Sequence, residues 1–128
     1  MDGVYFEHTQ KCYLRITVEA SWEEARSKCQ LSSNGDLASL SDSYWFLFNN
    51  YFDWNFSDYW VGGERVDGDW RWSDGSKWIN VYWAKGQPNE SEWHNAAMYI
   101  HNNHTYNMWY DGQKLKQKQF ICQYSLYI

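Results

Sequence analysis

The sequence predicts an α+β fold, with two helices packed on antiparallel sheets and a long ligand-binding loop. Three patterns favour this fold: a capping box near residue 21, an apolar stripe after Asp42, and short aromatic-rich strands separated by turns in the second half. At 128 residues the chain has the length of one domain, so residues 1–128 are expected to form a single unit.

The first third is expected to hold edge strands followed by a helix. Residues 4–18 alternate loosely, and their apolar side chains available to a core are Tyr5, Phe6, Tyr13 and Ile16. The helix is expected to begin at Ser21, whose hydroxyl can accept from the Glu24 amide while the Glu24 carboxylate reaches back. The apolar face of this helix, at positions i, i+3 and i+7, is formed by Trp22, Ala25 and Cys29.

A break and a second helix are expected next. Asn34 and Gly35 interrupt the chain, and Asp42 can cap a helix that runs to about residue 51. The aromatic stripe of that helix is formed by Trp45, Phe48 and Phe52, which are interpreted as core residues.

The second half is expected to be a sheet. Residues 59–64 predict a buried strand, and Asp67 with Gly68 predicts a tight turn that returns the chain to Trp70 and Trp72. After a long loop, residues 96–101 predict a strand with Met98 and Ile100 pointing inward, and residues 106–110 and 119–124 complete the sheet.

Composition excludes several classes of function. A net charge of −5 argues against binding to nucleic acid, which needs a basic face. The basic cluster of Lys114, Lys116 and Lys118 is interpreted as a solvated loop, with a polyanion site as the alternative.

No apolar run approaches the length of a membrane span. The chain has no nucleophile elbow, phosphate-binding glycine loop or histidine metal motif on a helix, so it is not expected to be an enzyme.

Five motifs resemble those of the C-type lectin-like domain, in that family's order. They are WRWSDGS at residues 70–76, Trp83 followed by GQPN at residues 86–89, YWVGG at residues 59–63, WYD at residues 109–111 and FICQ at residues 120–123. The resemblance spans residues 12–124, and it also matches residues 37–40 to a short strand of that fold. It implies an extracellular domain, secreted or part of a receptor, whose signal or anchor is not in this chain.

The resemblance also implies the pairing of the cysteines. Cys29 in the first helix would pair with Cys122 in the last strand, while Ala96 and Lys114 stand where a second disulfide would be, so the loop region is expected to be softer. Cys12 is left over from the three cysteines. It is interpreted as an orphan or buried thiol, or as the bridge of a homodimer.

A calcium and sugar site is implied at the loop. Gln87, Asn89 and Asp111 match ligand positions of sugar-binding members, whereas Tyr110 replaces an Asn and His94 stands where an acid is expected. Glu90 or Glu92 lies close enough in sequence to supply the missing carboxylate. A cis bond at the flanked Pro88 is expected if calcium is bound or the loop is held rigidly, because it would turn both amide oxygens toward one point. The other interpretation is a degenerate loop whose glutamates are only solvated.

The loop leaves the choice of ligand open. The Gln-Pro-Asn motif is a hybrid of the mannose and galactose types, and Trp93 either stacks on a sugar, which favours galactose, or plugs the loop. The sequons at Asn55, Asn89 and Asn103 are acceptors for N-glycans, and a glycan on Asn89 would block the site. The histidines of this half, His94, His101 and His104, are interpreted as a surface cluster rather than a zinc site.

Two functions therefore remain. The first is a calcium-dependent carbohydrate-binding domain that uses Gln87, Asn89, Glu92, Trp93 and Asp111. The second is a calcium-independent domain of a cell-surface receptor that recognises proteins, which the aromatic-rich loop favours. Ice or mineral binding is set aside because the chain has no regular array of Thr or Asn.

Overall fold

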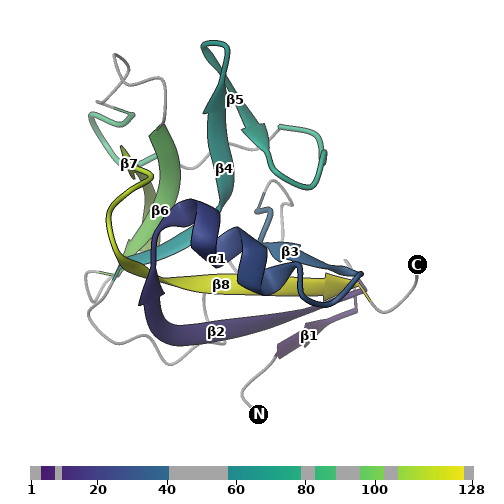
Figure 1. The fold of residues 1–128 in the computed structure, drawn as a ribbon. Coiled ribbons are helices and arrows are strands. Elements are labelled where there is room, and N and C mark those ends of the chain that lie inside the picture. The colour runs from purple at the N-terminus through teal and green to yellow at the C-terminus, as the bar shows by residue number, and fades with distance from the viewer. Residues whose placement is uncertain are drawn as a thin grey trace.

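The computed structural model describes residues 4–7, 10–40, 58–78, 83–88, 96–102 and 107–125. In order, the elements within these ranges are β1 (Val4–Phe6), β2 (Lys11–Ala20), α1 (Trp22–Cys29), β3 (Gly35–Leu37), β4 (Asp58–Val66), β5 (Asp69–Trp72), β6 (Ala96–Asn102), β7 (Asn107–Gln113) and β8 (Lys118–Ser125). The helix α1 lies against β3 and β8 (Figure 1).

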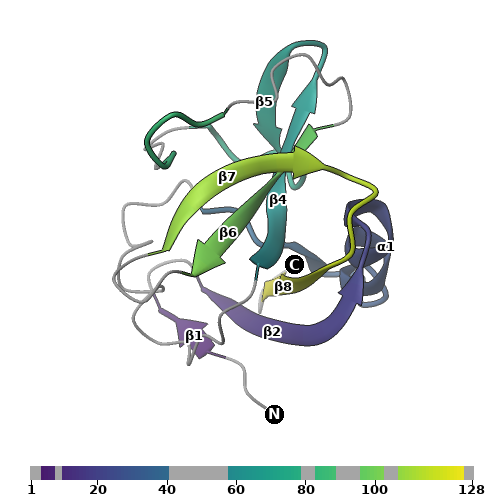
Figure 2. The ribbon, with the colours of Figure 1, turned by 90° about the vertical axis from the view of Figure 1, so that its left-hand side faces the viewer.

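The described strands form one sheet in the order β1-β2-β8-β4-β6-β7, with β3 added to β8 and β5 added to β4. All pairs are antiparallel except β4 with β8, which run parallel where Trp60 lies opposite Phe120. The expected antiparallel sheet is therefore mixed at this one place. In both ribbon views the β4–β5 hairpin and residues 83–88 lie in the upper half of the molecule, and β1 and β2 lie in the lower half (Figures 1 and 2).

The first helix has the predicted capping box. The Ser21 hydroxyl accepts from the Glu24 amide over 3.3 Å, and the Glu24 carboxylate accepts from the Ser21 amide over 3.1 Å. The hydrogen bond from the Ser21 amide lowers the pKa of Glu24. Trp22, Ala25 and Cys29 are all buried, which confirms the apolar face. This helix is far too short to span a membrane, and no other helix occurs in the described part of the chain.

The Cys29–Cys122 disulfide is present and joins α1 to β8, with a Cα–Cα distance of 5.4 Å. The two cysteines are separated by 93 positions in the sequence, so the bond closes a long loop. In the chain-entropy model, a loop of this length corresponds to about 4–5 kcal/mol of stabilisation. Cys12, in β2, is free and half-buried.

Two groups of buried side chains flank the sheet. One group lies under α1 and includes Trp22, Trp60 and Phe120, and the Trp22 indole donates to the Val61 carbonyl over 2.8 Å. The other group includes Tyr59, Trp72 and Trp109, which come from β4, β5 and β7. Buried tryptophans with a partner for the indole N–H combine large apolar area with fixed geometry.

Several expectations differ from the structure. Tyr5 is 47% exposed rather than in the core, because the edge strand β1 has β2 as its one neighbour. The strand expected at residues 37–40 ends at Leu37, because the Ala38 amide then donates to Ile121 while the Ala38 carbonyl accepts from Gly62.

Other expectations are confirmed or fall outside the described residues. The Asp67–Gly68 turn is confirmed, with φ of 51° and 86°. The second helix, expected from Asp42 to residue 51, and the predicted strand residue Tyr106 lie outside the described residues.

Candidate functional site

The segment Trp83 to Pro88 is fixed to β7 by its backbone. Trp83 forms a parallel bridge with Trp109, and the Ala84 amide donates to the Trp109 carbonyl over 2.9 Å. The Gln87 amide then donates to the Ala84 carbonyl over 2.9 Å, which closes a turn through Gly86 at φ 82°. The Gln87–Pro88 peptide bond is cis.

This turn brings Gln87 to Asp111. The side-chain oxygen of Gln87 accepts a long hydrogen bond of 3.5 Å from the Asp111 amide. Asp111 lies in β7 opposite Met98 and is only 4% exposed. The side-chain oxygen of Gln87 therefore lies beside the backbone of Asp111, which follows 24 residues later in the sequence.

Trp83, the first residue of this segment, packs into a group of five tryptophan rings. Trp72 and Trp109 are buried, and the half-buried rings of Trp70, Trp78 and Trp83 pack against their group. The Trp70 and Trp83 centroids lie 4.9 Å apart, and those of Trp72 and Trp78 lie 4.8 Å apart. Aromatic pairs at such distances add stabilisation beyond area burial, so the base of the loop is rigid.

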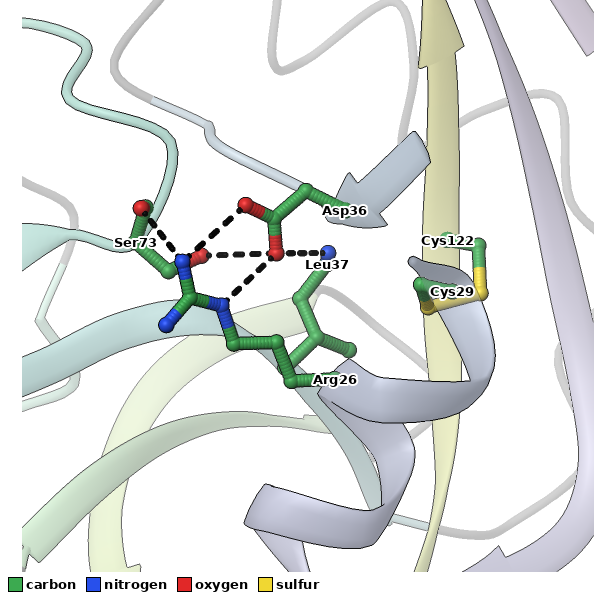
Figure 3. The surroundings of a disulfide bond; sticks show 6 residues. All are labelled: Arg26, Cys29, Asp36, Leu37, Ser73 and Cys122. Carbon is green, nitrogen blue, oxygen red and sulfur yellow. Dashed lines mark hydrogen bonds and ion pairs between the residues drawn. A yellow bond between two sulfur atoms is a disulfide. The ribbon is translucent and has the colours of Figure 1, made fainter. Parts of the chain in front are cut away.

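A first polar group joins α1 to the segment after β5. The Arg26 guanidinium contacts the Asp36 carboxylate at 3.1 Å and donates to the Ser73 carbonyl over 3.0 Å (Figure 3). The same carboxylate accepts from the Ser73 hydroxyl over 3.2 Å and from the Leu37 amide over 2.7 Å. The side chain of Asp36 thus links β3, α1 and the loop that carries the WSDGS residues.

A second polar group surrounds Asp74. Its carboxylate accepts from the Ser39 hydroxyl over 2.9 Å, the Gln123 side-chain amide over 2.7 Å and the Ser76 amide over 2.9 Å. Burial opposes ionisation of Asp74, but the hydrogen bonds from Ser76 and Gln123 and the Lys11 ammonium outweigh it and lower the pKa of Asp74. Asp74 is therefore a charged structural centre.

Of the residues predicted for the loop site, the structure brings together Gln87 and Asp111. The others, Asn89, Glu90, Glu92, Trp93 and His94, lie outside the described residues, as do all three sequon asparagines and His104. Tyr110 points to the opposite face of β7 from Asp111, where its ring stacks on Tyr99 at 5.7 Å.

The described histidine and two of the three clustered lysines form ion pairs. His101 pairs with Asp58 over 2.7 Å, and no group of three His, Cys, Asp or Glu side chains that could hold a metal occurs within the described ranges. The basic cluster is not simply solvated: Lys114 contacts Glu64 at 2.8 Å and Lys118 contacts Asp58 at 3.0 Å. Both ammonium groups also lie over aromatic rings, Lys114 over Trp22 at 4.4 Å and Lys118 over Tyr99 at 4.0 Å.

Sequence reasoning missed Arg65, which lies near the tip of the β4–β5 hairpin. Arg65 is half-buried and lies directly opposite Trp70 in the strand pairing. The signal available in the sequence was its place two residues before the Asp67–Gly68 turn. With a two-residue turn at Asp67 and Gly68, position 65 lies opposite position 70, which is Trp70 in this chain.

Comparisons with known proteins agree with this architecture. Residues 18–124 match the family model of the lectin C-type domain. The C-type lectin lectoxin-Lio3 of Erythrolamprus poecilogyrus is 31% identical over 125 residues, which covers 93% of this chain and 78% of that protein.

Two solved structures share the fold at lower identity. The C-type lectin domain of murine dendritic cell inhibitory receptor 2, solved in complex with N-glycan, has a TM-score of 0.82 at 23% identity, covering 97% of this chain and 96% of that one. A calcium-independent type II antifreeze protein has a TM-score of 0.79 at 21% identity, covering 97% and 92%. With the family match over most of its length, this chain belongs to the C-type lectin domain family.

Proposed function

We propose that residues 1–128 form a single extracellular carbohydrate-binding domain without catalytic activity. In this proposal the Gln-Pro-Asn loop binds calcium, and the calcium site binds a galactose-type sugar weakly. The calcium ligands are Gln87, Asn89, Glu92 and Asp111, and Trp93 stacks on the apolar face of the sugar.

The approach of Gln87 to Asp111 is the observation that carries the proposal. Calcium takes six to eight oxygen ligands from carboxylates, amides and water. The Gln87 side-chain oxygen lies 3.5 Å from the backbone amide nitrogen of Asp111, so two residues whose side chains carry oxygen donors of the right kind are neighbours. Asn89 and Glu92 follow within five residues of Gln87 in the sequence and would complete the ligand set together with water.

The expected affinity for a single sugar is low. A site that contacts two neighbouring hydroxyls makes few interactions, so useful binding comes from several copies acting together. The solved relative that holds an N-glycan supports a glycan as the class of ligand. A covalent homodimer through Cys12 would supply the second copy.

A glycan array with calcium, and again with a calcium chelator, tests the proposal. We expect galactose-terminated glycans to bind with calcium, and the signal to be lost with chelator and in Gln87→Ala. Lys85→Ala is the matched control, because this exposed side chain lies in the same turn and should leave binding unchanged. An empty array under both conditions, or an N-glycan on Asn89 in the native protein, would contradict the proposal.

The second candidate is calcium-independent recognition of a cell-surface protein. It is favoured by the three half-buried tryptophans beside the loop, Trp70, Trp78 and Trp83, because tryptophan dominates binding hot spots. The likeness to a calcium-independent relative is compatible with it. Binding of a protein ligand that persists in chelator and is lost in Trp93→Ala would favour this function over the first.

A further inference from the structure

The segment between α1 and β3 contains the chain's one Asn-Gly pair, Asn34 and Gly35. In such a pair the backbone nitrogen of the glycine can attack the side-chain carbonyl carbon of the asparagine. A C–N bond forms, ammonia leaves with the side-chain nitrogen and the glycine amide proton, and water then opens the cyclic imide to aspartate or isoaspartate. Glycine favours this attack because it has no side chain to hinder the approach. The pair is therefore a candidate site of modification.

Both reacting groups are occupied in the folded chain. The Gly35 amide, which would be the nucleophile, donates to the Ser32 carbonyl over 3.0 Å. The Asn34 side-chain amide, which would be attacked, donates to the Ser125 carbonyl at the end of β8. The Ser125 amide donates back to the Asn34 carbonyl over 3.1 Å. These hydrogen bonds have to break before the Asn34 side chain can turn from Ser125 toward the Gly35 nitrogen.

The packing around Gly35 explains why the fold keeps a reactive pair at this place. A Cβ atom here would lie far inside van der Waals contact with the Cys29 carbonyl oxygen, a backbone atom, and 2.7 Å from a carbon of the Tyr124 ring. Any other residue would therefore push the start of β3 away from the end of α1. Because glycine is required for packing, the reactivity that comes with it has to be suppressed by the conformation of the chain.

This suppression lasts only while β3 stays on β8. The strand has three residues, Gly35–Leu37, and among the described strands it pairs with β8 alone (Figure 1). The register places Gly35 opposite Tyr124 and Leu37 opposite Cys122, and Leu37 is fully buried in the group under α1. A short strand with one neighbour opens at a lower free energy than the whole domain, so local opening of β3 is the event that would release the Asn-Gly pair.

We propose that Asn34 is a latent deamidation site, closed in the folded protein and opened when β3 leaves β8. The product loses the contact that held the site closed, because a carboxylate at position 34 has no N–H to donate and would face the Ser125 carbonyl with an acceptor. Isoaspartate would also insert an extra carbon into the backbone between α1 and β3. The strand would then pair less well, so the reaction would permanently mark molecules that have opened. This inference does not depend on calcium or sugar binding.

Peptide mapping by mass spectrometry after incubation at neutral pH tests the inference. We expect deamidation at Asn34 to be at least about tenfold slower in the folded wild type than in the same chain reduced and unfolded in urea. Asn34→Gln should remove the product from both samples, because its longer side chain would have to close a larger ring. Equal rates in the folded and unfolded chain, or no product at position 34 in the unfolded chain, would overturn the inference.

Two leucines equally far from Asn34 along the chain give a matched pair of variants. Leu37 is fully buried, whereas Leu31 is 87% exposed, and neither is a direct neighbour of the Asn-Gly pair. Leu37→Ala should raise the rate of deamidation under folding conditions by about tenfold or more, because less apolar burial then opposes the opening of β3. Leu31→Ala should stay within about twofold of the wild type. Equal rates in the two variants would contradict a role for β3.

Hydrogen exchange of the Gly35 amide measures the opening independently and needs no variant. In wild type at urea concentrations below the unfolding transition, exchange at Gly35 and deamidation at Asn34 should rise in parallel. A deamidation rate that stays constant while exchange rises would overturn the inference, even if Leu37→Ala does not fold. Asn34→Asp, which imitates one product, should speed exchange at Gly35, and unchanged exchange would refute the proposed loss of pairing.

Discussion

The side-chain amide of Gln123 donates a hydrogen bond of 2.7 Å to the carboxylate of Asp74. This contact joins the last strand to the turn after β5, across 49 residues of sequence. The Asp74 side chain is 16% exposed, so its charge is held by neighbouring donors more than by water. The turn after β5 is therefore held to β8 by one ionised carboxylate.

Replacing Asp74 by Asn should lower the free energy of unfolding at neutral pH by about 1–3 kcal/mol, because charged hydrogen bonds to buried partners are lost. The pKa of Asp74 is lowered on folding, so its contribution is fully present above the unfolded value of 3.8 and is lost as the pH falls through the folded value. Urea unfolding at neutral and acidic pH measures this difference.

The exposed Asp69, in β5, provides the control for Asp74. Asp69→Asn should change stability by less than about 0.5 kcal/mol at either pH. Equal losses in the two variants, or a loss in Asp74→Asn that does not shrink in acid, would refute the role assigned to Asp74.

Lys114 is expected to stabilise the contact between the β7–β8 turn and α1. Its ammonium contacts Glu64 at 2.8 Å and lies 4.4 Å from the Trp22 ring centroid. Lys114→Met, which keeps the apolar stem, should cost about 1–3 kcal/mol. A double-mutant cycle with Glu64→Gln should give a coupling energy of about 1 kcal/mol.

Lys116 serves as the comparison for this cycle, because it is exposed in the same turn. Lys116→Met should be close to neutral. A coupling energy near zero would show that Lys114 acts through packing of its stem rather than through its charge.

Removing the disulfide should destabilise the fold far more than removing the free cysteine. Replacing Cys29 and Cys122 by Ala should lower the free energy of unfolding by about 2–5 kcal/mol. Cys12→Ser should leave it within about 0.5 kcal/mol and should abolish any covalent dimer on a non-reducing gel. A dimer that survives in Cys12→Ser would exclude the proposed bridge.

Calcium should raise the melting temperature in proportion to the logarithm of its concentration above the dissociation constant. Asp111→Asn removes one of the two charged ligands proposed and should weaken this response, while Asp69→Asn should retain it. Thermal scans after chelation and after stepwise addition of calcium measure the effect. A flat wild-type response up to about millimolar calcium would count against a calcium site.

Local patterns in the chain were sufficient to predict much of the fold. The capping box at Ser21, the turn at Asp67 and the buried strand that contains Trp60 depend on neighbouring residues. Such patterns are encoded within a few positions of sequence. The family resemblance added the Cys29–Cys122 pairing, which local patterns do not specify.

Other features required contacts between segments far apart in sequence. The parallel pairing of β4 with β8, the hydrogen bond from Gln123 to Asp74 and the contact of the Lys114 ammonium with the Trp22 ring join residues 49 or more positions apart in the sequence. The residues around one member of such a pair do not indicate which distant residue it will contact. The hydrogen bonds and the burial between the two members arise only after the chain has folded. The same reason hid the buried Nη1 atom of Arg65, which has no hydrogen-bond acceptor, since a missing partner is a property of the packed molecule and not of the sequence around it.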